Sequence, residues 1–300
     1  MSAPTQLTET KIPMLIDGRK VSKDIKEEIA QTVTSITASG GRAPHLAIII
    51  VGDDGASHTY VNGKINACKA VGFDFTLMHF ASTISEAKLI KHIEQLNQDE
   101  DIDGFIVQIP LPDHISVEHI TEKITPAKDV DGFTNQNFGS IMSSNQKLLP
   151  ATPYGVMELL SRYTIPLEGK RCVVVGASRI AGAPLSLMLL REGATVTVCH
   201  KLTQDLPSHT KEADILIVAV GKPGLVTKEM VKEGAVVIDV GTTRVEDPSR
   251  KSGFRLAGDV EFSEVSAKTS YITPVPGGVG PMTIASLLLN TLKAYEASHA

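Results

Sequence analysis

A tyrosine and a lysine one helical turn apart are the side chains of this sequence best placed to do chemistry together. Tyr60 and Lys64 belong to the segment Ser57-His-Thr-Tyr-Val-Asn-Gly-Lys64, so on a helix they share one face. The tyrosine offers a ring that can stack on a flat ligand, and the lysine offers an amine that can exchange a proton in a partly dry pocket. The pair alone leaves open the alternative of two solvent-facing side chains that pack against each other.

Two further polar residues, Gln108 and Asp131, lie in segments that can reach Tyr60 and Lys64. Gln108 closes a short apolar run before Pro110, and Asp131 lies within Lys128-Asp-Val-Asp-Gly132. A glutamine at a strand end can hold an amine in position, and an aspartate can accept hydrogen bonds from a heterocycle such as a pterin. An uncharged lysine held in this way could act as a base near neutral pH. The sequence therefore predicts one reactive group built from Lys64, Gln108 and Asp131.

A second group of residues has the spacing of a dinucleotide-binding turn. Gly176-Ala-Ser-Arg-Ile-Ala-Gly182 follows an apolar run and precedes a helical pattern, and the next apolar run ends at Cys199. Glycines allow a tight turn and a close approach of the backbone to a pyrophosphate at the N-terminus of a helix. Ser178 replaces the second glycine and Gly182 falls one position late, so an ordinary strand-to-helix turn is the alternative.

The residues after Cys199 distinguish NAD from NADP. An acid at this strand end would bind the ribose 2′-hydroxyl of NAD, whereas basic groups accommodate the 2′-phosphate of NADP. His200 and Lys201 stand here, and no acid occurs before Asp205. The sequence therefore favours NADP, and NAD is the alternative if Lys201 is only a solvated side chain.

A glycine- and proline-rich segment near the C-terminus could also line a site. Thr273-Pro-Val-Pro-Gly-Gly-Val-Gly-Pro-Met-Thr283 contains three glycines and three prolines before a helical pattern. Such a rigid segment with few Cβ atoms permits close approach of the backbone to a ligand. A purely structural connection between two domains is the alternative.

These residues need a framework of parallel strands to hold them. Apolar runs alternate with amphipathic helical patterns, which is typical of βα units, and ligands of a parallel sheet bind at the carboxyl ends of its strands. The first half of the chain predicts strands at 46–51, 75–80 and 104–108 and helices at 21–39, 57–71 and 85–96. The second half predicts a helix at 154–163, strands at 171–175, 195–199, 215–220 and 235–240, and an apolar helix at 281–296.

Glycines, prolines and polar residues between 129 and 153 interrupt this pattern and place a domain boundary near residue 150. The predicted fold class is α/β with two α/β domains. The first covers 13–150 and is completed by the C-terminal helix at 281–300, which we expect to pack back on it. The second covers 151–280 and is a Rossmann-type dinucleotide-binding domain with a parallel sheet.

Composition excludes several classes of protein. The chain has 300 residues, 42% hydrophobic and 21% charged, which is ordinary globular usage rather than that of a disordered chain or coiled coil. The net charge of −5 argues against a general nucleic-acid or membrane surface. Three cysteines without a CxxC pair predict no disulfide framework and no metal site, and they favour a cytoplasmic location. Residues 1–12 are polar and are expected to form a loose tail, and no apolar stretch is long enough to span a membrane.

Five motifs in order resemble the bifunctional methylenetetrahydrofolate dehydrogenase/cyclohydrolase (FolD) family. They are Tyr60-x-x-x-Lys64, VQIPLP at 107–112, KDVDG at 128–132, GxSxxxGxP at 176–184 and TPVPGGVGPMT at 273–283. The resemblance covers nearly the whole chain. It implies a homodimer of two-domain subunits that oxidises 5,10-methylenetetrahydrofolate with NADP+ and hydrolyses the methenyl product to 10-formyltetrahydrofolate.

The resemblance also implies roles for residues of this sequence. Lys64 would be the essential acid/base, Tyr60 would stack on the pterin, Gln108 would position Lys64, and Asp131 would bind the pterin ring. Four residues of the C-terminal loop would line the substrate cleft: Pro276, Gly277, Gly280 and Pro281. Cofactor contacts would come from Gly176, Ala177, Ser178, Arg179, His200, Lys201, Thr242 and Thr283.

Three positions depart from the family's usual pattern and bear on the cofactor. Ala177 replaces an arginine that contacts the 2′-phosphate, Lys201 replaces a serine, and Thr242 replaces an isoleucine. We hypothesise that Lys201 restores the lost positive charge.

Two other functions are weighed against this one. A different two-domain NAD(P)-dependent dehydrogenase of a small hydroxy or amino acid would need a catalytic histidine and acid, and His114 and His119 are better explained as surface helix residues. A non-catalytic folate or dinucleotide sensor would not need Lys64, Gln108 and Asp131 together.

Overall fold

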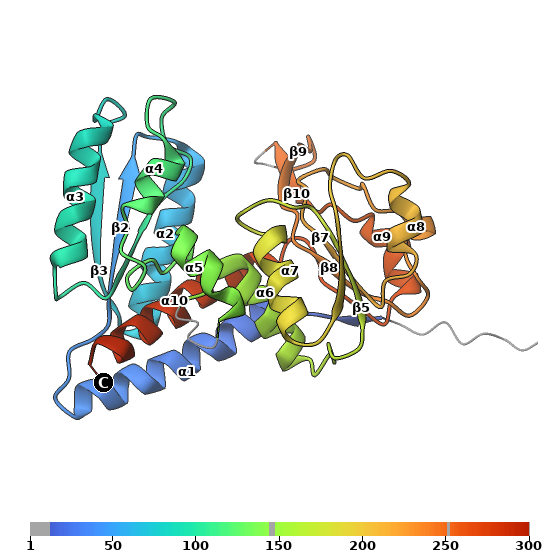
Figure 1. Ribbon diagram of the computed structural model, residues 1–300, viewed down its shortest axis with the longest axis horizontal. Coiled ribbons are helices and arrows are strands. Elements are labelled where there is room, and N and C mark those ends of the chain that lie inside the picture. Colours follow the sequence, from blue (N-terminus) through green and yellow to red (C-terminus); the bar gives the residue numbers. More distant parts are fainter. Residues whose placement is uncertain (1–12, 144–147, 251–252, 300) are drawn as a thin grey trace, which may run out of the picture.

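Two parallel sheets lie at opposite ends of the protein, with a layer of long helices between them (Figure 1). The computed structural model describes residues 13–143, 148–250 and 253–299. The predicted tail at 1–12 lies outside the described residues. The helices between the sheets are α1 (Gly18–Ala38), α6 (Ala151–Arg162) and α10 (Val279–Ser298).

The first sheet has three parallel strands in the order β3-β2-β4. These are β3 (Asp74–Phe80), β2 (His45–Val51) and β4 (Gly104–Val107). All three strands were predicted, and β2 is buried along nearly its whole length because helices cover both of its faces. The associated helices are α2 (Gly55–Val71), α3 (Glu86–Gln98) and α4 (Val117–Glu122). Ser85 caps α3 by accepting a hydrogen bond from the backbone amide of Lys88.

The second sheet has six parallel strands in the order β1-β11-β8-β7-β5-β6. The four predicted strands are β5 (Arg171–Val175), β6 (Thr195–Cys199), β7 (Ile215–Val218) and β8 (Val236–Asp239). Helix α7 (Gly182–Arg191) connects β5 to β6. β7 ends two residues earlier than predicted because the side chain of Asp259, rather than a neighbouring strand, accepts the amide hydrogen of Val220.

Two short strands of the second sheet were not predicted, and one of them lies near the start of the described chain. β1 (Met14–Leu15) and β11 (Tyr271–Ile272) pair with each other at the edge of the six-stranded sheet. The first described residues therefore extend the second sheet, although the sequence assigned them to the first domain. Two-residue strands carry too little periodicity to be recognised from sequence.

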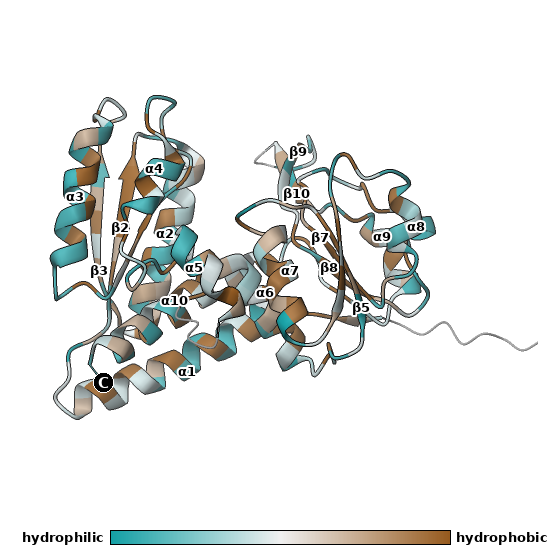
Figure 2. Ribbon diagram, in the orientation of Figure 1, coloured by the Kyte–Doolittle hydropathy of each residue, from teal (hydrophilic) through white to brown (hydrophobic). Residues whose placement is uncertain are grey.

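The remaining elements are short. β9 (Thr243–Glu246) and β10 (Phe254–Ala257) form an antiparallel hairpin beside the second sheet. The short helices are α5 (Asn135–Gly139), α8 (Leu206–Thr210) and α9 (Phe262–Val265), with 3₁₀ turns at 140–142, 228–230 and 266–268. Hydrophobic residues concentrate in the strands and on the inner helices, and hydrophilic ones on outer helices such as α3 and α8 (Figure 2).

Helix α10 joins the two ends of the molecule. It packs against α1, α2 and α6 and reaches β2 and β4 of the first sheet. The two helices α6 and α10 cross closely at Gly155, where a Cβ atom would lie only 2.8 Å from the Cβ of Met282. Residues more than a hundred positions apart thus form one helical layer.

Other predictions from the sequence can be judged here. Cys68, Cys172 and Cys199 are free and buried, and burial raises the pKa of the Cys68 and Cys172 thiols to about 12. His119 lies on an exposed helix as predicted, whereas His114 lies in the turn before that helix and not in it. None of the described helices combines the length and the apolar character that crossing a membrane requires.

Candidate functional site

Lys64 and Gln108 meet at the carboxyl end of the first sheet. Lys64 projects from α2 and is only 8% exposed, and its Nζ donates a hydrogen bond to Oε1 of Gln108 at 3.1 Å. The amide of Gln108 is itself held, because its Nε2 donates to the carbonyl of Ile109 at 2.7 Å. The lysine is therefore buried against a neutral partner, an arrangement in which the amine is oriented but its charge is not neutralised.

Asp131 shares this environment. Burial raises the pKa of the Asp131 carboxyl, and the nearby charge of Lys64 opposes that shift. Its position is set by the preceding turn, in which the carboxylate of Asp129 accepts hydrogen bonds from the amides of Gly132 and Thr134. Asp129 is thus the structural acid of the Lys128–Gly132 segment, and Asp131 is the one left to interact with a ligand.

Tyr60 lies one turn before Lys64 on α2, and its side chain is 56% exposed. The first turn of this helix is fixed by Asp54, whose carboxylate accepts hydrogen bonds from both the amide and the hydroxyl of Ser57. An exposed ring beside a buried amine suits a ligand with a flat part and a reactive centre.

The glycine-rich loop at 273–283 leads into α10 and packs against the start of α1. A Cβ atom on Gly18 would lie 1.7 Å from the carbonyl oxygen of Gly278, so only glycine fits there. Gly277 has a φ of +116° and accepts a hydrogen bond from the amide of Arg19. Pro276 and Gly280 are exposed and Pro281 is half-buried, so these three can still be reached by a ligand.

The turn after β5 has the close packing that the sequence predicted. Gly176 has a φ of +118°, and a Cβ atom there would lie 2.2 Å from the carbonyl oxygen of Ala219. A Cβ on Gly182 would lie 1.8 Å from the carbonyl oxygen of Gly176, which explains why this glycine is needed although it falls one position late. Ala177 and Ser178 are exposed, and no side chain caps the N-terminus of α7.

Arg179 connects this turn to the other half of the molecule. Its guanidinium donates hydrogen bonds to Oε1 of Glu122 at 3.3 Å and to the carbonyl of Phe133 at 3.1 Å, and it lies 3.7 Å from Glu118. Sequence reasoning assigned Arg179 to the cofactor, but in this structure its partners belong to α4 and the loop before α5.

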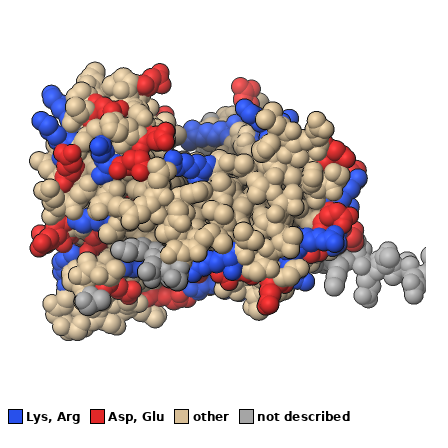
Figure 3. Space-filling model, viewed as in Figure 1, with Lys and Arg blue, Asp and Glu red and all other residues tan. Residues whose placement is uncertain are grey.

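The remaining predicted cofactor residues follow strands of the second sheet, except Thr283, which lies on α10. His200 and Lys201 follow β6 and are exposed, and Nδ1 of His200 accepts the amide hydrogen of Leu202. Thr242 is exposed after β8, and the Thr283 hydroxyl lies 3.1 Å from that of Thr152. Figure 3 shows lysine and arginine side chains beside a hollow between the two halves, at the top of the view.

Sequence reasoning missed two sets of positioning residues. Asn290 on α10 is buried and donates hydrogen bonds to the carbonyls of Val130 and Leu149, which holds the segment that carries Asp131. Asp259 accepts hydrogen bonds from the amides of Val220 and Gly221 beside the dinucleotide-binding turn. A polar residue within the otherwise apolar α10 pattern was the only signal for Asn290, and Asp259 had none.

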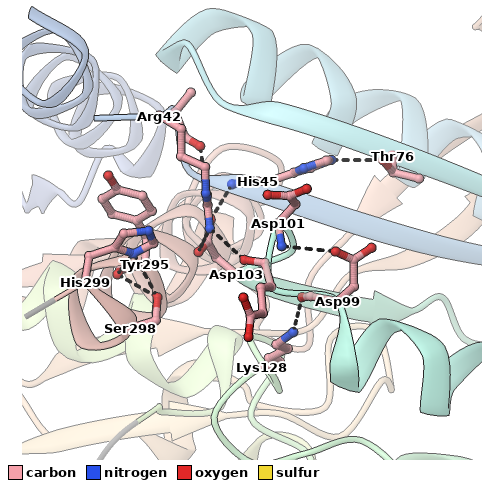
Figure 4. Close-up of polar contacts among 12 residues, drawn as sticks. Arg42, His45, Thr76, Asp99, Asp101, Asp103, Lys128, Tyr295, Ser298 and His299 are labelled. Carbon is pink, nitrogen blue, oxygen red and sulfur yellow. Dashed lines mark hydrogen bonds and ion pairs between the residues drawn. The ribbon is translucent and has the colours of Figure 1, made fainter. Parts of the chain in front are cut away.

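Charged residues also gather at the opposite, amino-terminal end of the first sheet. Figure 4 shows Arg42 paired with Asp103, through bonds of 2.7 and 2.8 Å, and Lys128 bound to the carbonyl of Asp99. A cavity of about 950 Å³ lies here, between the ends of α3 and α10. Arg42 and Asp103 form an ion pair, so this end holds the fold together, whereas Lys64 donates its hydrogen bond to a neutral amide.

Comparisons with known proteins agree with this geometry. The chain matches the catalytic domain model of tetrahydrofolate dehydrogenase/cyclohydrolase over residues 16–131 and the NAD(P)-binding domain model over residues 150–299. The bifunctional protein FolD of Cytophaga hutchinsonii is 55% identical over 284 residues, which is 93% of this chain and 98% of that protein.

Solved structures show the same likeness. The FolD crystal structure from Campylobacter jejuni has a TM-score of 0.90 and 47% identity, and the match covers 95% of this chain and 99% of that one. The FolD structure from Trypanosoma brucei, complexed with NADP and an inhibitor, has a TM-score of 0.91 and 41% identity, with 96% and 98% covered. The chain belongs to the tetrahydrofolate dehydrogenase/cyclohydrolase family.

Proposed function

We infer that the protein is a bifunctional enzyme of folate one-carbon metabolism. It oxidises 5,10-methylenetetrahydrofolate with NADP+ and hydrolyses the resulting 5,10-methenyltetrahydrofolate to 10-formyltetrahydrofolate. The observation that carries this function is the buried Lys64 amine, held by Gln108 and set beside Asp131 and the exposed ring of Tyr60. The other dehydrogenase and the sensor considered above are not favoured by any feature of this site.

The folate-binding residues have distinct tasks in this proposal. Tyr60 stacks on the flat part of the substrate, and Asp131 accepts hydrogen bonds from the pterin ring. Gln108 keeps the Lys64 amine in one orientation. Pro276, Gly277, Gly280 and Pro281 line the cleft, where backbone without bulky side chains lets the substrate approach closely.

The two reactions differ in what they ask of Lys64. In the dehydrogenase step the nicotinamide ring, when bound, accepts a hydride from the methylene carbon, and the protein only needs to orient the substrate. In the cyclohydrolase step water attacks the methenyl carbon. Lys64 removes one proton from that water and returns it to the ring nitrogen as the carbon–nitrogen bond breaks, and the remaining hydroxyl proton leaves to solvent as the formyl carbonyl forms.

The residues at the second sheet fit a dinucleotide. The exposed Ala177 and Ser178 in the tight turn after β5, and the uncapped start of α7, suit a pyrophosphate at a helix N-terminus. In this proposal the exposed His200 and Lys201 contact the 2′-phosphate of NADP. Ala177, Ser178, Arg179, Thr242 and Thr283 complete the proposed cofactor contacts, and Arg179 would have to exchange Glu122 for the cofactor or retain it as a bridge between the two halves.

Further features of the family are proposed for this chain as well. We propose a folate-binding domain at 13–150 completed by the C-terminal helix, a Rossmann domain at 151–280, a homodimer and a cytoplasmic location. Its 10-formyl product would supply one-carbon units for purine synthesis, and its substrate pool would connect to methionine and histidine synthesis.

A direct assay tests the function. Purified protein is mixed with 5,10-methylenetetrahydrofolate and NADP+, and the absorbance of NADPH and of the methenyl intermediate is followed with time. We expect NADPH to form and the methenyl absorbance to decay to 10-formyltetrahydrofolate. A protein that forms no NADPH with this substrate would disprove the proposed function.

Cofactor choice has a separate test in Lys201→Ala. Loss of one charged contact to the 2′-phosphate should raise the KM for NADP+ about tenfold and leave the KM for the folate unchanged. The matched control is Lys211→Ala, which removes an exposed lysine from the end of α8 in the same half of the molecule. An unchanged KM for NADP+ would reject the role of Lys201.

A further inference from the structure

Three side chains that a transition-metal ion could bind lie together at the carboxyl end of the first sheet. Asp53 follows β2, His58 is in the first turn of α2, and His79 is on β3. One ligand atom of each lies within 4.8 Å of the other two. None of the three is used in the proposed folate or cofactor site.

The distances approach those of a metal centre. Oδ1 of Asp53 lies 3.3 Å from Nε2 of His79 and 3.7 Å from Nε2 of His58. With Zn–N and Zn–O bonds of about 2.0–2.1 Å, tetrahedral ligand atoms are about 3.3 Å apart. The two imidazole rings are edge-on, with centroids 5.2 Å apart and planes at 84°, so both nitrogens can face one point near the carboxylate.

The backbone holds the three residues in place. His79 pairs in register with Ile50 of β2, and its Nε2 also lies 3.1 Å from the carbonyl oxygen of Gly52. His58 is held by the helix that Asp54 caps, since the Asp54 carboxylate binds Ser57. Small rotations of side chains, rather than movements of the backbone, would complete the geometry.

We propose that Asp53, His58 and His79 form a binding site for Zn²⁺ or a divalent first-row ion of similar chemistry. Two neutral imidazoles and one carboxylate suit such an ion, and three protein ligands leave a fourth position for water. The ion would replace the proton that His79 now shares with the Asp53 carboxylate and the Gly52 carbonyl.

The site would tie α2 to the sheet. His58 is two residues before Tyr60 and six before Lys64 on the same helix. A bound ion would join the first turn of α2 to β3 and so restrict the element that carries the proposed folate-stacking ring. Metal binding itself does not depend on the proposed enzymatic activity, so the two can fail separately.

The test is zinc binding by the full-length, tag-free protein after treatment with a chelator. We expect calorimetric titration with Zn²⁺ to show one equivalent bound and a raised melting temperature. Co²⁺ should give the visible absorption of a low-coordinate nitrogen and oxygen site. His79→Gln and His58→Gln should each weaken zinc binding more than about tenfold. Even residues that only hydrogen-bond to a metal ligand change metal affinity by about 10–100-fold when they are replaced.

His119→Gln is the matched control. His119 also contacts a carboxylate, that of Glu86 at 2.7 Å, but it belongs to no group of three metal-ligand side chains among the described residues. This variant should bind zinc like the unmodified protein. Absence of zinc binding, or binding that survives both His79→Gln and His58→Gln in folded protein, would overturn the proposal.

Discussion

The two ends of the first sheet hold positive side chains in different ways. At the amino-terminal end Arg42 makes two hydrogen bonds to Asp103, whose carboxylate also accepts the amide hydrogen of His45. At the carboxyl end Lys64 has a single hydrogen bond to the amide of Gln108. Asp103 and Lys64 are both buried, at 5% and 8% exposure, so burial alone does not distinguish the two ends.

The difference lies in the charge of the partner. A carboxylate compensates a cation and stabilises its charged form, and accordingly the hydrogen bonds that Arg42 donates to Asp103 raise the pKa of Arg42. An amide orients a cation without compensating it. The Lys64 amine is held in one orientation by an amide, as the proposed proton transfer requires, whereas an ion pair of the Arg42–Asp103 kind keeps its charge and its geometry.

The largest effect on this comparison is expected from Lys64→Met. Removing the proposed proton carrier should lower the cyclohydrolase rate by about 10²–10⁴-fold, and the free energy of unfolding should not fall, because an apolar side chain replaces a buried amine whose hydrogen-bond partner is a neutral amide. Both activities and a urea melt of each variant measure this.

Lys69→Met is the control, since Lys69 is an exposed lysine on the same helix whose Nζ lies over the Phe75 ring. It should keep full activity. A Lys64→Met protein that hydrolyses the methenyl compound at the normal rate would refute the role of Lys64.

The opposite result is expected from Asp103→Asn. Leaving Arg42 without its carboxylate should lower the free energy of unfolding by about 2–4 kcal/mol, whereas the activity of the folded fraction should be unchanged. Urea unfolding followed by circular dichroism gives the stability, and assays well below the midpoint give the activity. Unchanged stability would mean that the two ends of the sheet do not differ as proposed.

Gln108→Glu should give Lys64 a carboxylate partner, like the partner that Arg42 has in Asp103 at the other end of the sheet. A carboxylate about 3.1 Å from the Lys64 amine would favour the ammonium form, so the activity profile should move to higher pH and fall about tenfold at neutral pH. Rates measured across a pH series test this. If the profile of Gln108→Glu coincides with that of the unmodified protein, Gln108 does not act on Lys64.

The smallest effect concerns Asp131. Because burial raises its pKa, the folded protein binds this proton more tightly than the unfolded chain does. Its contribution to stability is therefore present at low pH and is lost as pH rises from the unfolded value through the folded one. Asp131→Asn should flatten this part of the stability curve, as urea melts at several pH values would reveal. An identical slope in both proteins would contradict the assignment.

Much of the architecture could be predicted from the sequence because it depends on local pattern. Strands such as β2 and helices such as α3 can be recognised from the apolar pattern of their residues. Lys64 and Gln108 could be paired in advance because both lie near the carboxyl ends of neighbouring parallel strands. Gly182 was identified from the sequence as a glycine of the turn. The structure adds that a side chain there would collide with the carbonyl oxygen of Gly176.

Other features depend on residues far apart in the chain and had no local signal. β1 joins the second sheet through pairs with β11, more than 250 positions away, and Arg179 binds Glu122 across the two halves. Asn290 holds the Val130 carbonyl from a helix at the other end of the chain.

By itself, then, the sequence determined the α/β class, the order of the main elements and the meeting of Lys64 with Gln108, since periodicity and motif spacing follow from neighbouring residues. The tertiary structure alone decided which partner each charged side chain has. It pairs Arg42 with Asp103, gives Lys64 a neutral amide, and brings Asp53, His58 and His79 together. Compensation depends on distances between atoms of different elements, and only the folded chain brings those atoms together.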